Sequence, residues 1–179
     1  SLFQSVTTRT AGFFTVSQAG LTEAGKAVSD MLMFVGGSSG STAGGLKTVT
    51  LGVVVLAAVG TARGRSRASV FRHTIPQEKV SQAMTLFMLM LTLAFVGAAL
   101  ICACSGCSLS TALYETVSAL ATVGLTAGLT ATLTTLPKLL LIVFMFFGRV
   151  GIMTISIGFL TASRAEDRFE YAPARMLIG

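Results

Sequence analysis

The sequence carries very little charge for its length. Only 11% of its 179 residues are Asp, Glu, Lys or Arg, whereas a soluble domain carries about 25%. The segment from Val80 to Tyr114 contains none of these residues, and a helix needs roughly 20 apolar residues to cross a bilayer. A soluble globular domain is therefore excluded, and we expect an all-α integral membrane protein.

Metal ligands and catalytic groups are also scarce. The sequence has a single histidine, His73, and its three cysteines form the pattern C-x-C-x-x-C at residues 102–107. A zinc site needs further Cys or His ligands close by, so we interpret these cysteines as small, mostly buried residues. No group of residues resembles an acid–base pair, an activated nucleophile or a metal cage, so we predict neither enzymatic activity nor a cofactor.

The positive charges are concentrated in two places. Five of them lie in the loop 63–79 and three in the tail 163–179. Short loops rich in Lys and Arg stay in the cytoplasm, and an even number of membrane crossings separates the loop from the tail. We therefore interpret the basic residues as topology signals that contact lipid, and not as a nucleic-acid surface. The protein is predicted to be multi-pass with a cytoplasmic C-terminus.

Three segments are long and apolar enough to span a membrane: Met31–Ala62, Val80–Cys104 and Leu136–Ala162. The first is interrupted by GGSSGSTAGG at residues 36–45, and the last contains Arg149. The loop places flexible backbone at membrane depth, which is tolerated only inside protein or beside water. Arg149 places a charge there, which is costly unless it faces water or a partner. Both features therefore indicate a water-filled path.

The chain contains an internal repeat at an offset of 112 residues. The pattern T-x-G occurs at residues 10–12 and 122–124, and M-F-x-G occurs at 33–36 and 145–148. Between residues 1 and 37, nine positions are identical to the residue 112 positions later. An ordinary turn is the alternative reading of a single T-x-G, but its repetition before matched apolar segments favours a functional role.

The second repeat predicts a pore-loop unit, with a helix over 80–104, a half-helix over 108–120, T-x-G, and a last helix over 136–162. In such a unit, backbone carbonyl oxygens replace the hydration shell of a permeating cation. Glycine lets the backbone point its carbonyls inward, and the half-helix directs the negative end of its dipole toward the ion. Residues 1–62 read as the end of a similar unit and residues 80–162 as a complete one.

Four segments, TTRTAGF, MFVGGSSGSTAGGLKT, SALATVGLTAG and MFFGRVG, resemble the Trk/Ktr/HKT potassium transporters, and most closely the bacterial Ktr/Trk membrane subunit. The resemblance implies four pore-loop units around one pore in a single chain. This sequence would then hold the end of the third unit and the whole fourth unit, without the first two. The half alone is not expected to form a pore.

The resemblance also assigns a selectivity filter, within 8–12 and 121–125, to two groups of residues. These are Thr8, Arg9, Thr10, Ala11 and Gly12 in the third unit, and Ala121, Thr122, Val123 and Gly124 in the fourth. In the family, glycine at this filter position goes with potassium, which would be the ion bound there. A serine in the first unit favours sodium, and that unit lies outside this sequence.

By the same resemblance, the loop 36–45 is an intramembrane gate beneath the filter. Its five glycines each disfavour a helix by about 1 kcal/mol relative to Ala, and its hydroxyl groups can satisfy freed backbone groups. The alternative is close helix packing through small residues. A phosphate-binding loop is disfavoured because Leu46 separates Gly45 from Lys47 and no strand precedes the segment. The assigned gate residues are Gly36, Gly37, Ser38, Ser39, Gly40, Ser41, Thr42, Ala43, Gly44, Gly45, Lys47 and Arg149.

Arg149 follows Lys138 by eleven residues, which places it about 16 Å along the last helix. A charge at that depth is costly unless it faces water or a partner. The repeat offset pairs it with Gly37, at the start of the flexible loop, and the resemblance places the matching arginine in the pore. The alternative is an ion pair with a carboxylate such as Glu115.

The predicted function is therefore potassium uptake across the cytoplasmic membrane. The resemblance implies a homodimer of membrane subunits and a cytoplasmic ring that binds the regulatory nucleotide, with the loop 63–79 and the tail as contact surfaces. Two alternatives stay open: a sodium-selective or poorly selective transporter of the same fold, and a membrane scaffold that conducts no ions.

Overall fold

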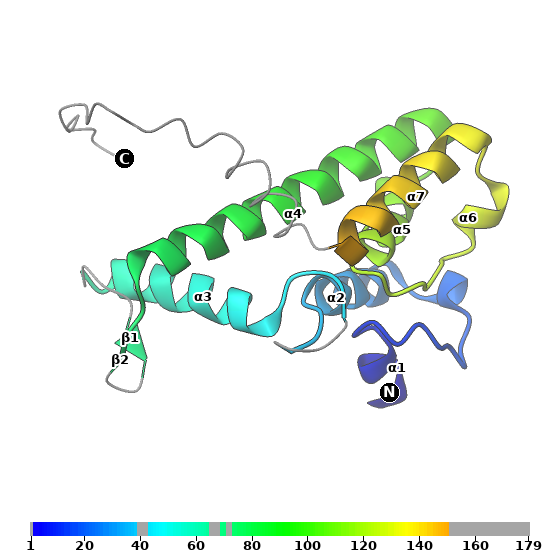
Figure 1. The fold of residues 1–179 in the computed structure, drawn as a ribbon. Coiled ribbons are helices and arrows are strands. Elements are labelled where there is room, and N and C mark those ends of the chain that lie inside the picture. Colours follow the sequence, from blue (N-terminus) through cyan, green and yellow to red (C-terminus); the bar gives the residue numbers. More distant parts are fainter. Residues whose placement is uncertain (1, 39–42, 65–68, 71–72, 151–179) are drawn as a thin grey trace, which may run out of the picture.

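The computed structural model describes residues 2–38, 43–64, 69–70 and 73–150, and these are mainly helical (Figure 1). The helices are α1 Leu2–Thr7, the 3-10 helix η1 Gln18–Gly20, α2 Glu23–Phe34, α3 Thr48–Ala62, α4 Gln77–Ser105, α5 Leu109–Leu120, α6 Leu129–Thr132 and α7 Thr135–Val150. The strands β1 Ser69–Val70 and β2 His73–Thr74 form a two-residue antiparallel hairpin. The predicted all-α class is confirmed.

Helix α4 is the longest element and contains the predicted segment Val80–Cys104. It follows Pro76, which cannot continue a preceding helix, and it ends at Gly106, whose φ of 62° gives a left-handed C-cap. Its 29 residues extend about 44 Å. Among the described residues, it is the one helix long and apolar enough to cross a membrane by itself.

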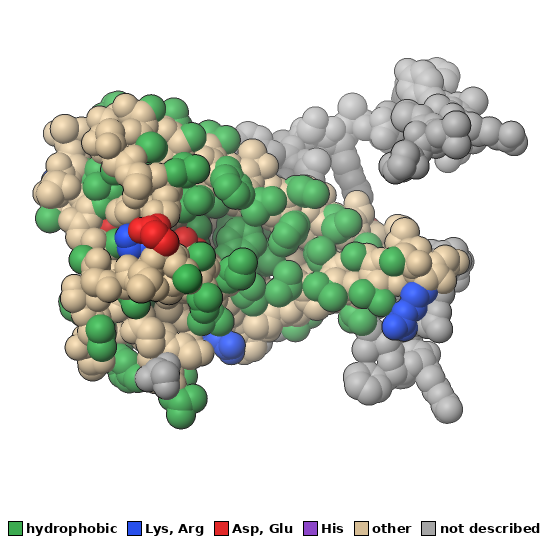
Figure 2. All heavy atoms as spheres, turned by 180° about the vertical axis from the view of Figure 1, so that it is seen from behind, with side chains coloured by type: hydrophobic (Ala, Val, Ile, Leu, Met, Phe, Trp, Pro, Cys, Tyr) green, Lys and Arg blue, Asp and Glu red, His purple; other side chains and the backbone are tan. Residues whose placement is uncertain are grey.

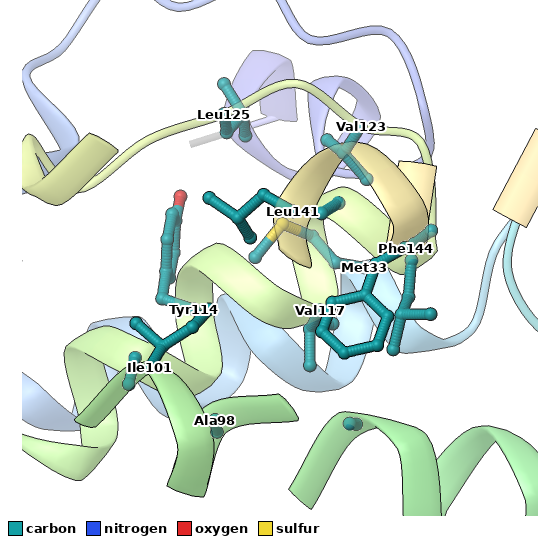
Figure 3. Packing of buried hydrophobic residues seen from close by; sticks show 14 of the residues in the cluster. Met33, Ala98, Ile101, Tyr114, Val117, Val123, Leu125, Leu141 and Phe144 are labelled. Atoms are coloured by element: carbon teal, nitrogen blue, oxygen red, sulfur yellow. The ribbon is translucent and has the colours of Figure 1, made fainter. Parts of the chain in front are cut away.

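Helix α5 lies at the centre of the structure. Its N-cap, Ser108, accepts a hydrogen bond from the amide of Thr111, and every residue from Tyr114 to Leu120 is buried. It packs against α2, α4 and α7. Figure 3 shows how side chains from four helices converge, including Met33, Ala98, Val117 and Phe144.

The predicted segment Met31–Ala62 is not one continuous helix. Helix α2 ends at Phe34, and the chain becomes helical again at Thr48, where α3 begins. Between them, the backbone of Leu46 pairs with that of Phe34 and Gly36, through N–O distances of 3.2 and 2.9 Å. This short parallel bridge brings the two ends of the loop together, and α3 then packs along α4 (Figure 1).

Apolar side chains gather over the middle of the face shown in Figure 2. On α7 alone, Leu139, Ile142 and Phe146 are each more than half exposed. Soluble monomers rarely expose large contiguous apolar patches. This surface therefore belongs in contact with lipid or with further protein, in agreement with a membrane fold.

The hairpin β1–β2 was not predicted from the sequence. It lies in the basic loop 63–79, and it pairs Ser69 with Thr74 and Val70 with His73. The tail 163–179 and the second half of the predicted helix 136–162 lie outside the described residues.

Candidate functional site

Both T-x-G motifs have positive φ at the threonine and at the glycine. Thr10 and Thr122 have φ values of 67° and 55°, and Gly12 and Gly124 have φ values of 77° and 85°. Within the described part of the chain, these threonines are the only non-glycine residues with positive φ. A β-branched residue in this region is a clear outlier, and such strain concentrates at functional sites. Its occurrence at matched positions marks both turns as candidate site segments.

Each turn begins where a half-helix ends. Helix α1 ends at Thr7 and α5 at Leu120. The amide of Gly12 donates to the Thr7 carbonyl at 3.2 Å, and the amide of Val123 donates to the Ser118 carbonyl at 2.9 Å. Both turns therefore leave the C-terminus of a helix, the end that carries partial negative charge.

A hydroxyl group from each half-helix also fixes the backbone just beyond the glycine. Ser118 Oγ donates to the carbonyl of Leu125 at 2.6 Å, and Thr7 Oγ1 donates to the carbonyl of Phe13. Leu125 and Phe13 are equivalent positions of the repeat. In both units, a hydroxyl group of the half-helix thus holds the chain after T-x-G by a hydrogen bond to a backbone carbonyl.

The two turns lie side by side. A Cβ atom placed on Gly12 would collide with the carbonyl oxygen of Val123. Only a glycine lets the backbone of one unit come so close to the carbonyl of the other. The structure therefore brings both predicted filter segments to one place.

The predicted filter residues differ in burial. Thr8, Ala121 and Val123 are buried, so they support the turns from behind, and Thr8 Oγ1 donates to the Ser5 carbonyl at 3.0 Å. Thr10, Gly12 and Thr122 are intermediate in exposure, whereas Arg9, Ala11 and Gly124 are exposed.

The predicted gate loop contacts the second turn. The amide of Gly44 donates to Thr122 Oγ1 at 3.2 Å, and a Cβ atom on Gly44 would lie 2.9 Å from the carbonyl oxygen of Ala121. At the other side of the loop, a Cβ atom on Gly36 would collide with the carbonyl of Gly44. Residues 39–42 of the predicted gate lie outside the described residues.

The end of α7 passes directly behind the same turn. Gly148 is buried, and a Cβ atom there would collide with the Leu120 carbonyl. Arg149 follows it in the last turn of α7 with an exposed side chain. Glu115, the carboxylate suggested as an alternative partner of Arg149, accepts hydrogen bonds from Thr126, Ala127 and Thr130. Lys47 is the N-cap of α3 and is partly buried.

Sequence reasoning gave no site role to Gln18, Tyr114 or Glu115. Gln18 lies in the loop after the first turn and receives a hydrogen bond from Tyr114 Oη, while Glu115 holds the loop after the second turn. One signal in the sequence could have indicated Glu115. It is the only charged residue between Lys79 and Lys138.

Known proteins match this chain over nearly its whole length. The family model TrkH, described as a cation transport protein, matches residues 1–170. The potassium/sodium uptake protein NtpJ of Enterococcus hirae is 40% identical over 100% of this chain and 41% of its own length.

Two further relatives are named Ktr system potassium uptake protein B. The Bacillus subtilis protein is 34% identical over 94% of this chain and 38% of its own length. The Vibrio alginolyticus protein is 33% identical over 100% of this chain and 39% of its own length. This chain therefore spans about two fifths of the length of the curated relatives it matches.

Proposed function

The chain belongs to the TrkH family of cation transport proteins, and from this premise we propose that it supplies two filter segments of a potassium uptake pathway. The family and its named relatives are transport proteins and not enzymes, as the scarcity of catalytic groups predicted. Relatives more than twice as long indicate that the working transporter contains further sequence. We propose that this further sequence, outside the present chain, supplies the first two pore-loop units.

The observation that carries the proposal is the pair of matched turns. Thr10 and Gly12 repeat the left-handed backbone of Thr122 and Gly124, and Gly12 lies against the carbonyl of Val123. Adjacent turns at the C-termini of two half-helices can direct carbonyl oxygens toward a common point. Such oxygens replace the water around a cation, and the helix ends add favourable negative potential.

We further propose that the loop 36–45 closes the pathway beneath this filter. The hydrogen bond from Gly44 to Thr122 Oγ1 supports this role, because it ties the loop to the turn that would bind the ion. Arg149 is proposed to repel cations at the same level. Its neighbour Gly148 packs behind the turn, and repulsion between charges in a narrow path of low dielectric is worth several kcal/mol.

The relatives' name "Ktr system" supports a multi-component assembly. We propose a homodimer of membrane subunits in the cytoplasmic membrane, opened by a cytoplasmic ring that binds a nucleotide. In this arrangement the hairpin β1–β2 and the C-terminal tail face the cytoplasm, because basic segments are retained there.

A second candidate is transport of both potassium and sodium. The printed name of the Enterococcus hirae relative, potassium/sodium uptake protein, favours it. The glycines at residues 12 and 124 favour potassium, so potassium is the proposed principal ion.

Expression of the complete transporter in bacteria that lack their own potassium uptake systems tests the proposal. We expect growth at low external potassium, and uptake of radioactive rubidium that potassium inhibits much more strongly than sodium. Equal inhibition by both ions would support the second candidate. No growth and no rubidium uptake, with the assembled protein present in the membrane, would refute the transport function.

A further inference from the structure

Glu115 fixes the segment that follows the second T-x-G turn. Its carboxylate is 4% exposed. One oxygen accepts the amide of Ala127 at 3.1 Å and the hydroxyl of Thr126 at 2.5 Å, and the other accepts the hydroxyl of Thr130 at 2.7 Å. A carboxylate is acceptor-only and can take several donors at once. It therefore ties the chain from residue 126 to residue 130 to the middle of α5.

Tyr114, the residue before it, makes the matching contact with the other unit. Its side chain is fully buried, and its hydroxyl donates to Gln18 Oε1 at 3.0 Å. Gln18 is itself buried and also contacts Gln4 and the carbonyl of Val16, through distances of 2.7 and 2.8 Å. Figure 3 shows the Tyr114 ring extending from α5 with its hydroxyl group pointing away from the helix.

Consecutive residues on a helix point about 100° apart. Tyr114 and Glu115 can therefore reach two different chain segments from one position on α5. The segments they hold follow the two T-x-G turns, at residues 16–18 and 126–130. One buried helix is thus connected to the segments that follow both candidate filter turns.

We propose that Tyr114 and Glu115 are positioning residues that brace the two filter turns and so set the ion preference of the transporter. This inference rests on the proposed potassium pathway. The hydrogen bonds of both side chains go to segments beyond T-x-G, so each acts through the backbone that it holds. Carbonyls discriminate between ions by their spacing and number, and that spacing is kept only if the strained turns cannot relax. The buried hydrogen bonds to Glu115 and Gln18 oppose such relaxation.

Substitutions in the complete transporter test the proposal by the ratio of potassium to sodium inhibition of rubidium uptake. Glu115→Ala leaves three donors without their acceptor, and we expect the ratio to fall about tenfold, the equivalent of one hydrogen bond to a charged group. Glu115→Gln keeps an acceptor for Ala127 and Thr126, and its amide can donate to Thr130, so it should retain a ratio close to that of the original protein.

Two further variants separate bracing from general damage. Thr130→Val removes one donor to Glu115, and we expect it to lower the ratio by about threefold and to add little in combination with Glu115→Ala. Thr85→Val removes a hydroxyl that donates to the Ser81 carbonyl on the exposed side of α4, and it should leave the ratio unchanged. Tyr114→Phe should lower the ratio by about two- to threefold, because Gln18 retains its bond to Gln4.

Three outcomes would overturn the proposal. The first is an unchanged ratio for Glu115→Ala in assembled protein. The second is a Glu115→Gln variant as impaired as Glu115→Ala, because bracing by hydrogen bonds would then not be the mechanism. The third is an unchanged ratio for Thr130→Val, which becomes the deciding variant if Glu115→Ala fails to assemble. An unsubstituted transporter that carries neither ion would refute the proposed function itself, and the bracing role with it.

Discussion

Gly12 and Gly124 occupy equivalent positions of the repeat, yet replacing each by serine should have different consequences. Both glycines have positive φ, where a side chain costs roughly 1–2 kcal/mol. At Gly12 the added Cβ atom also collides with the Val123 carbonyl. At Gly124 no described atom lies within 4 Å of the added Cβ.

The magnitudes follow from these two environments. Gly124→Ser should cost about 1–2 kcal/mol of folding free energy from backbone strain alone. Gly12→Ser should cost about 2–5 kcal/mol, because overpacking against a backbone carbonyl adds about 1–3 kcal/mol to the strain. The carbonyl of Val123 cannot move away without altering the second turn. Gly12→Ser should therefore disturb both filter segments, and Gly124→Ser mainly its own.

The measurement has two parts, made in the complete transporter. The amount of assembled protein extracted from the membrane, and its melting temperature, should fall more for Gly12→Ser than for Gly124→Ser. The potassium-to-sodium inhibition ratio of rubidium uptake should fall in both variants, because both alter the proposed filter. Unchanged ion preference in both variants would show that these turns are not the filter. Equal loss of assembled protein would show that the contact between Gly12 and Val123 is not close in the membrane.

Three further predictions concern the packing around the turns. Gly44→Ala should displace the loop from Thr122, because the added methyl group collides with the threonine hydroxyl. Potassium flux at rest should then rise, and a fall in flux per assembled molecule would contradict the role of the loop as a gate. Arg149→Ala should speed rubidium uptake without loss of assembled protein, and reduced assembly without faster uptake would remove its role as a barrier. Gly97→Ala should cost about 1–3 kcal/mol and lower the melting temperature, because a Cβ atom there meets Phe144 and Thr116. Gly52→Ala on α3 is the control, because a Cβ atom there meets open space, and it should leave the melting temperature unchanged. Equal melting temperatures for the two variants would contradict the packing.

The membrane class, the main helices and the repeat could be predicted from the sequence because they depend on local pattern. The near absence of charge between Val80 and Tyr114 requires an apolar environment, and α4 occupies that segment. Matched T-x-G motifs at one offset indicated matched turns, and Thr10 and Thr122 both have positive φ. The role of the two T-x-G turns as a filter stays a prediction, as does the role of Arg149 and the loop 36–45 as a gate.

Other features depended on contacts between residues far apart in the chain. Nothing near Gly44 predicts that its amide meets Thr122, 78 residues away. Likewise, nothing near Glu115 in the sequence predicts that its carboxylate accepts hydrogen bonds from the donors of residues 126–130. The sequence by itself determined which segments are apolar, helical and repeated, because hydrophobic burial and glycine conformation are properties of short stretches. Only the tertiary structure decided which buried polar groups form hydrogen bonds with one another. A buried donor or acceptor needs a partner, and the packing of α2, α4, α5 and α7 decides which groups lie within reach.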